Sequence, residues 1–401
     1  MLRQEQISAV IDSQKESFLN KEVGIVRESL KNIPIIDSYA TIITGIRRCG
    51  KSTLLLQLLR QQYANAIFLN FEDIRLAGFE VSDFTRLQNE IEKRGVKVIF
   101  LDEVQIVEKW EIFVHQLLRE EYVVFITGSN ASLLSKELGT HLTGRHVSME
   151  LFPFSYNEFL LIKGMESGEQ SFNDYLNAGG IPEYVKSGQP IILSSLIDDI
   201  LIRDIAVRHS IKDVDSLRQL AVYLITNVGN LVSANKLSGM FGLKSSATIL
   251  DYFSYLKDSY LVEFLPQFNY SIKAQARNPK KIYSIDPGII QEISISFTED
   301  VGRKLENIVY LHLRRNYKEL YYYKEKGECD FVSFLKGQPQ KAIQVCYHIN
   351  DLNFEREYNG LLEAMKAFQL EEGCIVTLNQ EDTFSKDGYT IQMIPAYRFL
   401  I

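Results

Sequence analysis

Residues 40–53 read ATIITGIRRCGKST, and an apolar run, LLLQLL, follows at 54–59. The β-branched residues predict a short strand, the apolar run predicts a helix, and the turn between them has the pattern G-x-x-x-x-G-K-S. This is the phosphate-binding loop (P-loop) in the strand–loop–helix context that the motif requires. Gly45 and Gly50 permit backbone angles that turn several N–H groups inward, and a helix starting at Lys51 directs the positive end of its dipole to the same place. A chance glycine turn is the alternative explanation.

The chemistry of a P-loop assigns roles to individual side chains of this stretch. Lys51 is predicted to reach the β- and γ-phosphates of a nucleoside triphosphate, and the Ser52 hydroxyl is predicted to bind Mg²⁺. The predicted nucleotide-binding residues are Gly45, Arg48, Cys49, Gly50, Lys51, Ser52 and Thr53. We therefore expect ATP and Mg²⁺ as ligands.

The pattern from 39 to 150 alternates strands with helices, which predicts a mainly parallel sheet with helices on both faces. The predicted strands cover 40–45, 66–70, 96–101, 122–127 and 146–150. The third strand delivers Asp102 and Glu103 at its C-terminal end, as in a Walker B motif. Asp102 is predicted to hold the Mg²⁺ shell, and Glu103 to polarise the water that attacks the γ-phosphate. A strand that ends in surface acids is the alternative.

Two further positions are candidates for catalysis. A polar residue after the fourth strand, Ser129 or Asn130, is placed to hydrogen-bond the attacking water and the γ-phosphate; residues 127–129 would otherwise be only a helix N-cap. Arg145 precedes the fifth strand and is a candidate to stabilise charge on the transferred phosphoryl group, in its own subunit or from a neighbour. A structural ion pair is the alternative for Arg145. The lead-in, residues 1–38, is expected to be helical, with Arg27 as a solvated charge or facing the base.

Composition limits the class of protein. A chain of 401 residues suggests about two or three domains. The net charge of −7 gives no global attraction to nucleic acid or to an anionic membrane, so such binding must be local. The four cysteines are scattered, which favours reduced thiols in the cytoplasm, and neither a signal peptide nor a membrane-spanning run is expected.

The chain after the P-loop core is expected to hold three further parts. Residues 151–208 read as a helical lid, and 209–300 as a winged-helix domain. Within the latter, residues 268–281 are basic, contain aromatics and lack acids. Such a segment can contact phosphates and stack on unpaired bases, which makes DNA a predicted partner. The predicted contacts are Lys273, Arg277, Lys280 and Lys281. A solvated loop, or a winged helix that binds protein, is the alternative.

Residues 301–401 resemble the PD-(D/E)XK nuclease core in the order of their predicted helices and strands. Active members of that group place an Asp, and then Glu-x-Lys, around a metal ion. Here Gln344 and Cys346 occupy the Glu-x-Lys positions, and neither can replace the missing charge. The remnant acids are Glu306, Glu328 and Asp330. We expect a nuclease-like domain that no longer cleaves.

Taken together, these motifs resemble one family: the AAA-type ATPases of bacteria and archaea that carry a C-terminal domain of unknown function. The resemblance is carried by 45–52, 101–103, 127–129, 144–145, 151–159 and 179–184. It implies an α/β fold with an additional-strand P-loop core, a requirement for ATP and Mg²⁺, and Glu103 as the catalytic glutamate. We expect an ATP-hydrolysing motor or switch that acts on DNA as a dimer or ring. A nucleotide-gated regulatory ATPase that binds protein instead of DNA is the alternative.

Overall fold

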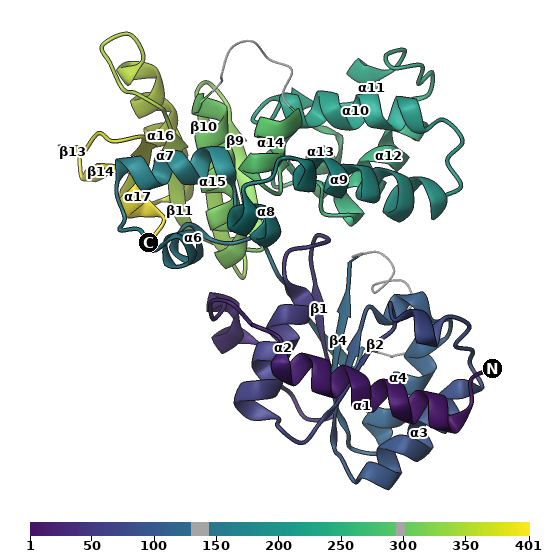
Figure 1. The fold of residues 1–401 in the computed structure, drawn as a ribbon. Coiled ribbons are helices and arrows are strands. Elements are labelled where there is room, and N and C mark those ends of the chain that lie inside the picture. Colours follow the sequence, from purple (N-terminus) through teal and green to yellow (C-terminus); the bar gives the residue numbers. More distant parts are fainter. Residues whose placement is uncertain (130–143, 294–300) are drawn as a thin grey trace. The chain divides into compact units, whose positions relative to one another are not determined.

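The computed structural model describes residues 1–129, 144–293 and 301–401 (Figure 1). The chain divides into two units, Met1–Phe152 and Pro153–Ile401. The segments expected to form the lid, the winged helix and the nuclease-like domain fall in the second unit, apart from the first two residues of the lid. In the described ranges, none of the helices combines the length and the apolar character that a membrane crossing requires.

The first unit is built on a five-stranded parallel sheet with the order β2-β3-β4-β1-β5. Its strands are β1 (Ala40–Thr44), β2 (Ile67–Asn70), β3 (Val98–Asp102), β4 (Val123–Gly128) and β5 (His146–Glu150). Its described α-helices are α1 (Gln4–Asn20), α2 (Lys51–Gln62), α3 (Asp83–Arg94) and α4 (Trp110–Arg119). β4 lies between β1, which leads into the P-loop, and β3, which ends in Asp102. The predicted α/β class and its P-loop sheet are therefore confirmed.

Alternation along the strands gives this sheet two different apolar faces, because successive side chains of a strand point to opposite sides. On one face, Ile99 and Leu101 join a core that includes Ile7 and Ile11 of α1. That helix is purple in Figure 1. On the other face, the aligned rings of Phe68, Phe100 and Phe125 stack, with centroid distances of 6.4 and 4.8 Å. Burial on both faces fixes the strand register and so the position of the strand ends that carry the site.

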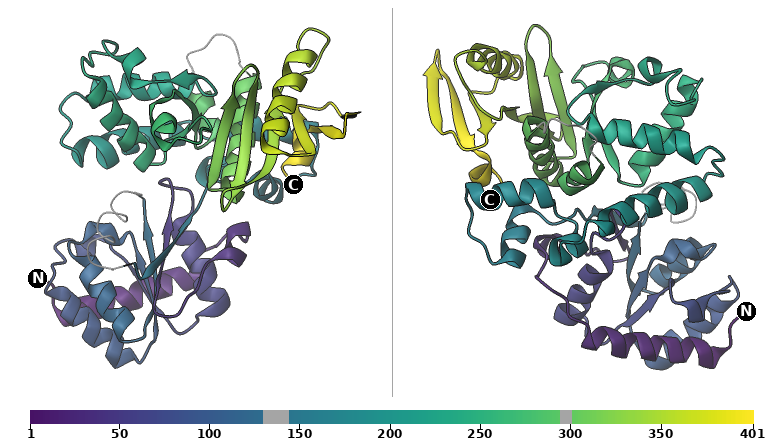
Figure 2. Two further views of the ribbon diagram at one scale, coloured as in Figure 1. Left: turned by 180° about the vertical axis from the view of Figure 1, so that it is seen from behind. Right: turned by 45° about the horizontal axis from the view of Figure 1, so that its top comes forward.

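The second unit contains two sheets. The larger has six strands in the order β13-β14-β12-β11-β10-β9, and the smaller has three antiparallel strands in the order β6-β8-β7. The six are β9 (Glu319–Lys324), β10 (Glu328–Leu335), β11 (Gln338–Val345), β12 (Glu372–Thr377), β13 (Asp382–Lys386) and β14 (Tyr389–Pro395). The three are β6 (Leu231–Val232), β7 (Val262–Leu265) and β8 (Lys280–Ser284). Figure 2 shows the yellow hairpin β13–β14 at one end of the larger sheet and the green strands toward the other.

Helices surround both sheets of the second unit. Before β6 lie α6 (Tyr156–Lys163), α7 (Glu169–Ala178), α8 (Pro182–Ser187), α9 (Ile191–Asp199), a π-helix (Ile200–Val207) and α10 (Val214–Thr226). Between β6 and β9 lie α11 (Ala234–Leu237), α12 (Ser246–Asp258), α13 (Ile272–Arg277), α14 (Pro287–Ile293) and α15 (Val301–Asn316). The last two are α16 (Phe354–Phe368) and α17 (Ala396–Phe399). Leu361 and Met365 of α16 pack on the larger sheet and form its core with Val332 and Ile375.

Two expectations about helices were wrong. The lead-in is not helical throughout: α1 ends at Asn20, and only a short 3₁₀ turn (Glu28–Asn32) follows in residues 21–38. The helix expected over 233–241 is reduced to α11. Gly239 and Phe241 have positive φ values of 87° and 53°, a left-handed conformation that cannot continue an α-helix.

Candidate functional site

The P-loop connects β1 to α2 in a conformation that requires its two motif glycines. Gly45 has φ of 141°, and a Cβ there would lie 2.2 Å from the carbonyl oxygen of Leu151. Gly50 has φ of 99° and is the N-cap of α2. The loop therefore opens onto the N-terminus of a twelve-residue helix, where backbone N–H groups and the helix dipole favour an anion.

Lys51 is held inside this loop. Its side chain is only 4% exposed, and its ammonium donates hydrogen bonds to the carbonyl oxygens of Gly45 (3.1 Å) and Ile46 (3.2 Å). The same nitrogen lies 3.7 Å from a carboxylate oxygen of Glu103. Lys51 therefore joins the loop to the end of β3, as the sequence predicts for a phosphate-binding lysine.

Asp102 lies at the centre of a buried group of hydroxyl and amide donors. The Ser52 hydroxyl donates to its Oδ1 (3.1 Å), the Thr127 hydroxyl donates to the same oxygen, and the Asn70 amide donates to Oδ2 (3.0 Å). Burial raises the pKa of Asp102 to about 6; Thr127 and Ser52 lower it, and the nearby Glu103 charge raises it. A buried carboxylate beside a serine hydroxyl offers the hard oxygen ligands that Mg²⁺ prefers.

Glu103 projects from the same strand end. It is held in the left-handed region with φ of 51°, where its backbone N–H donates to the Thr127 hydroxyl (3.0 Å). One carboxylate oxygen accepts from the Gln105 amide and the other faces Lys51. The unusual backbone therefore turns the carboxylate toward the loop, where it lies beside Lys51.

Three residues of this site were missed by the sequence reasoning. Asn70 ends β2 and Thr127 is the last but one residue of β4, the strands on either side of β3. Their only signal was a polar residue at the end of a predicted strand. Arg27 was read as a solvated charge or a group facing the base, but it is 3% exposed. Its guanidinium donates to the carbonyl oxygens of Cys49 and Phe152, both at 2.8 Å.

The remaining loop residues are also part of the site. Arg48 has φ of 64° and Cys49 is buried, which raises the pKa of its thiol. Thr53 lies half-buried in the first turn of α2. Ser129 directly follows β4 and is 4% exposed. Its alternative, Asn130, lies outside the described residues.

Arg145 does not lie near the P-loop of its own chain. Its carbonyl oxygen accepts from the N–H of Ala40, at the beginning of β1, whereas the P-loop follows the end of β1. Four residue steps of about 3.3 Å separate these two ends. The position of Arg145 at the opposite edge of the sheet argues against a role in its own site, and two of the predicted roles remain, a contact with the site of a neighbouring subunit and a structural ion pair.

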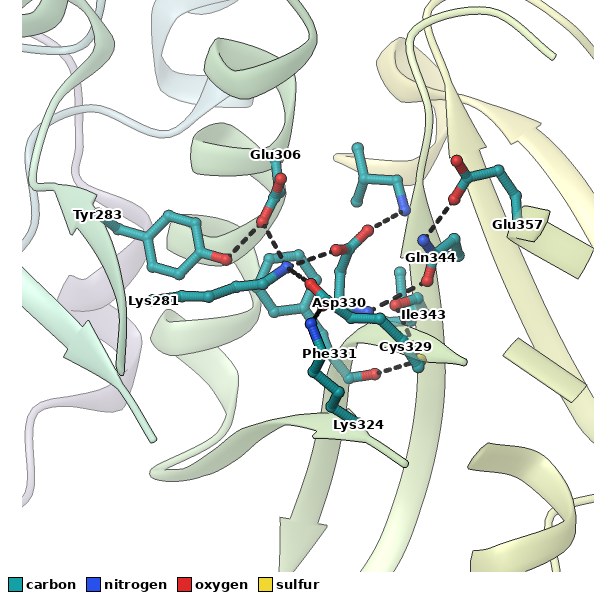
Figure 3. Close-up of polar contacts among 12 residues, drawn as sticks. Lys281, Tyr283, Glu306, Lys324, Cys329, Asp330, Phe331, Ile343, Gln344 and Glu357 are labelled. Atoms are coloured by element: carbon teal, nitrogen blue, oxygen red, sulfur yellow. Dashed lines mark hydrogen bonds and ion pairs between the residues drawn. The ribbon is translucent and has the colours of Figure 1, made fainter. Parts of the chain in front are cut away.

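The predicted nucleic-acid contacts divide into exposed and buried residues. Lys273 and Arg277 are exposed on α13, and Lys280 is half-buried. The prediction for Lys281 is corrected: its side chain is only 3% exposed, and its ammonium is paired with Glu306, Glu328 and Asp330. Figure 3 shows the contacts with Glu306 and Asp330. Neighbouring residues of a strand face opposite sides, so β8 cannot present both lysines to solvent.

The comparisons with known proteins agree with this geometry. Residues 37–160 match the family model described as an AAA domain, and residues 169–299 match a domain of unknown function (DUF8612). The uncharacterized protein MJ1544 of Methanocaldococcus jannaschii is 32% identical, over 94% of this chain and 92% of its own. An uncharacterized protein of Haemophilus influenzae is also 32% identical, over 83% of this chain and 91% of its own.

The fold and the site define an AAA-type protein with a P-loop core. The chain belongs to the family of AAA-domain proteins that includes the M. jannaschii and H. influenzae relatives.

Solved structures resemble the chain only distantly. One is a signal-transduction ATPase (STAND) protein of Pyrococcus horikoshii, with 14% identity, a TM-score of 0.29, and coverage of 74% of this chain and 46% of that chain. Another is DnaA of Aquifex aeolicus, with 18% identity, a TM-score of 0.26, and coverage of 57% and 85%. This chain therefore spans less than half the length of the first, and likenesses with such scores carry no functional argument.

Proposed function

We propose that this protein binds ATP with Mg²⁺ at the P-loop and hydrolyses it. The observation that carries the proposal is the connected set of Lys51, Ser52, Asp102 and Glu103, which the loop and the end of β3 bring together. Lys51 exchanges the carbonyls of Gly45 and Ile46 for the β- and γ-phosphates, which attract its ammonium more strongly than neutral oxygens do. Ser52 and Asp102 are the residues that hold Mg²⁺, which neutralises charge on the phosphates.

The Glu103 carboxylate then accepts a hydrogen bond from the attacking water and polarises this water. Its contact with Lys51 keeps the carboxylate beside the phosphates, and Thr127 fixes its backbone. Ser129 is proposed to hydrogen-bond the same water from the end of β4. Glu103, Thr127 and Ser129 lie at the C-terminal edge of one sheet and Lys51 begins the helix that follows β1, which supports a preorganised site.

We further propose that the second unit engages DNA and is moved by nucleotide turnover. Residues 151–208 act as a lid, 209–300 as a winged-helix domain and 301–401 as an inactive nuclease-like domain. Support comes from the antiparallel sheet β6-β8-β7 with α10–α12 beside it, and from Lys273 and Arg277 on α13. Tyr270, 90% exposed in the same acid-free segment, is available to stack on a base.

Replacing Lys273, Arg277 and Lys280 together by alanine tests this contact. Because each lost phosphate contact removes about 0.9 from the slope of log affinity against log salt, we expect weaker binding and a shallower slope. Binding and ATP turnover are measured with duplex, single-stranded and forked DNA at controlled salt. The matched control replaces three exposed lysines of the same unit, Lys163, Lys186 and Lys212. If none of these DNAs changes the rate of ATP turnover, and the triple variant binds DNA as the parent does, the alternative of a regulatory ATPase that binds protein is favoured.

Self-association is the last part of the proposal, because a catalytic role for Arg145, at the edge of the sheet opposite the P-loop, requires the site of a second copy. We expect turnover per chain to rise with protein concentration, and Arg145→Ala to lose turnover about 10³-fold. Mixing Arg145→Ala, which has an intact P-loop, with Lys51→Ala, which has an intact Arg145, is expected to restore part of the activity. A rate per chain that is independent of concentration, together with an unchanged Arg145→Ala rate, would rule this part out.

A further inference from the structure

The ammonium of Lys281 is enclosed by three carboxylates of the second unit. Its Nζ lies 2.6 Å from Asp330 Oδ1, 3.0 Å from Glu328 Oε1 and 3.2 Å from Glu306 Oε1. An ammonium carries three N–H donors, which matches the three carboxylates. The side chain of Lys281 is 3% exposed and that of Asp330 8%, so water replaces few of these contacts.

Further donors hold the carboxylates in place. The Tyr283 hydroxyl donates to Glu306 (2.7 Å), the backbone N–H of Val345 donates to Asp330 Oδ2 (2.9 Å), and Lys324 pairs with Glu328 at 2.8 Å. The carboxylates therefore do not depend on Lys281 alone for their orientation.

The members of this cluster come from three separate elements. Figure 3 shows Lys281 reaching from β8 toward Glu306 of α15 and Asp330 of β10. Gln344 of β11 is engaged elsewhere: its amide oxygen accepts from the N–H of Asp330 (3.1 Å) and its amide nitrogen donates to Glu357. Within the part of the chain that the structure describes, the cation between the three acids is thus Lys281, which the sequence analysis predicted to contact nucleic acid.

We propose that Lys281 is a built-in cation, whose ammonium takes the place of a divalent metal ion among Glu306, Glu328 and Asp330. In this role it fastens the small sheet to α15 and β10, and it keeps the cluster free of metal. Among the described residues, no group of three or more His, Cys, Asp or Glu side chains is arranged to hold a metal ion. This inference does not depend on the proposed ATPase or DNA-binding functions.

Lys281 keeps its proton at neutral pH. Burial by itself lowers the pKa of Lys281, but the carboxylates, Asp330 first, raise it well above its ordinary value. A metal ion would therefore have to displace a buried, charged ammonium from its three carboxylates. Removing the lysine is therefore the direct test.

The test compares Lys281→Met with Lys280→Met, its half-buried neighbour on β8, in the full chain. Both variants and their parent carry Asp102→Asn, which removes the other carboxylate proposed to hold metal. In EDTA we expect Lys281→Met to melt about 10 °C lower than the parent, because three carboxylates lose a buried partner. Adding Mn²⁺ at pH 8 without nucleotide is expected to raise the melting temperature of Lys281→Met part of the way back to that of the parent.

Calorimetric Mn²⁺ titration supplies the second readout. Lys281→Met is expected to gain at least about tenfold in Mn²⁺ affinity over the parent, and Asp330→Asn in the same chain is expected to remove the gain. Lys280→Met should behave as the parent does in both measurements. If Lys281→Met does not fold, Lys281→Met with Glu306→Gln removes one charge of each sign and keeps two carboxylate ligands for the same titration.

Two results would overturn the inference. One is stoichiometric Mn²⁺ binding by the parent that Asp330→Asn abolishes, since the ammonium would then not fill the site. The other is a folded Lys281 variant that gains neither Mn²⁺ affinity nor thermal stability on addition of Mn²⁺. Because the parent measurement needs no substitution of Lys281, the inference can be refuted even if both lysine variants are unstable.

Discussion

Replacing Lys51 with alanine is expected to abolish ATP turnover, lowering kcat by at least about 100-fold, the usual loss when a positioned electrostatic group is removed. Nucleotide affinity should fall about 10- to 100-fold as well, because a charge-assisted hydrogen bond contributes about 1.5–3 kcal/mol. The cause is local: the buried ammonium lies between the loop carbonyls and Glu103, and alanine removes its charge from the phosphate-binding loop. Phosphate release and equilibrium binding of a fluorescent ATP analogue measure the two effects.

The matched control for this variant is Lys97→Ala. Lys97 is exposed just before β3, at the opposite end of that strand from Asp102, and its ammonium lies over the Tyr122 ring at 4.5 Å. The Lys97→Ala substitution removes one positive charge from the same unit, and we expect it to leave ATP turnover unchanged. A Lys51→Ala protein that binds and hydrolyses ATP as the parent does would refute the proposed function at its first step.

Replacing Glu103 with glutamine is expected to separate binding from hydrolysis. Glutamine keeps the shape of the side chain but accepts a proton poorly, so kcat should fall about 10²- to 10⁴-fold while ATP affinity changes little. Single-turnover measurements should show ATP bound and uncleaved. Glu108→Gln, at an exposed position five residues later, makes the same chemical change outside the site.

The Glu103→Gln result also distinguishes two assignments at the end of β3. If Glu103 served only to hold Lys51, the variant would lose affinity and turnover together. If it polarises water, turnover falls alone. Equal loss in both quantities would therefore contradict the role proposed for this carboxylate.

Three features were predictable because each depends on a pattern of consecutive residues. They are the P-loop, the five strands and the acidic pair. Strand, turn and helix preferences at 40–59 agree with one another, and an apolar strand followed by two acids needs no information from elsewhere in the chain. Asn70 and Thr127 were not predictable in the same way. Their bonds to Asp102 exist because β3 lies between β2 and β4, and strand order is a property of the whole sheet.

The burial of two cations was also not predictable from the local sequence. Arg27 and Lys281 each read as an isolated surface cation, since their acceptors lie 22 to 125 residues away in one case and 25 to 49 in the other. One local signal was present for Lys281. It follows Lys280 at the start of a predicted strand, and the two side chains of such a pair must point in opposite directions.

The double hydrogen bond of Arg27 has a consequence for how the first unit ends. One guanidinium holds both Cys49, in the middle of the P-loop, and Phe152, the last residue before the chain passes into Pro153. The phosphate loop and the exit of the polypeptide are thus joined by one side chain, beside the hydrogen bond from the N–H of Leu151 to the carbonyl of Thr44. We expect a shift of the loop backbone at Cys49 to be transmitted through this guanidinium to the last residue of the first unit.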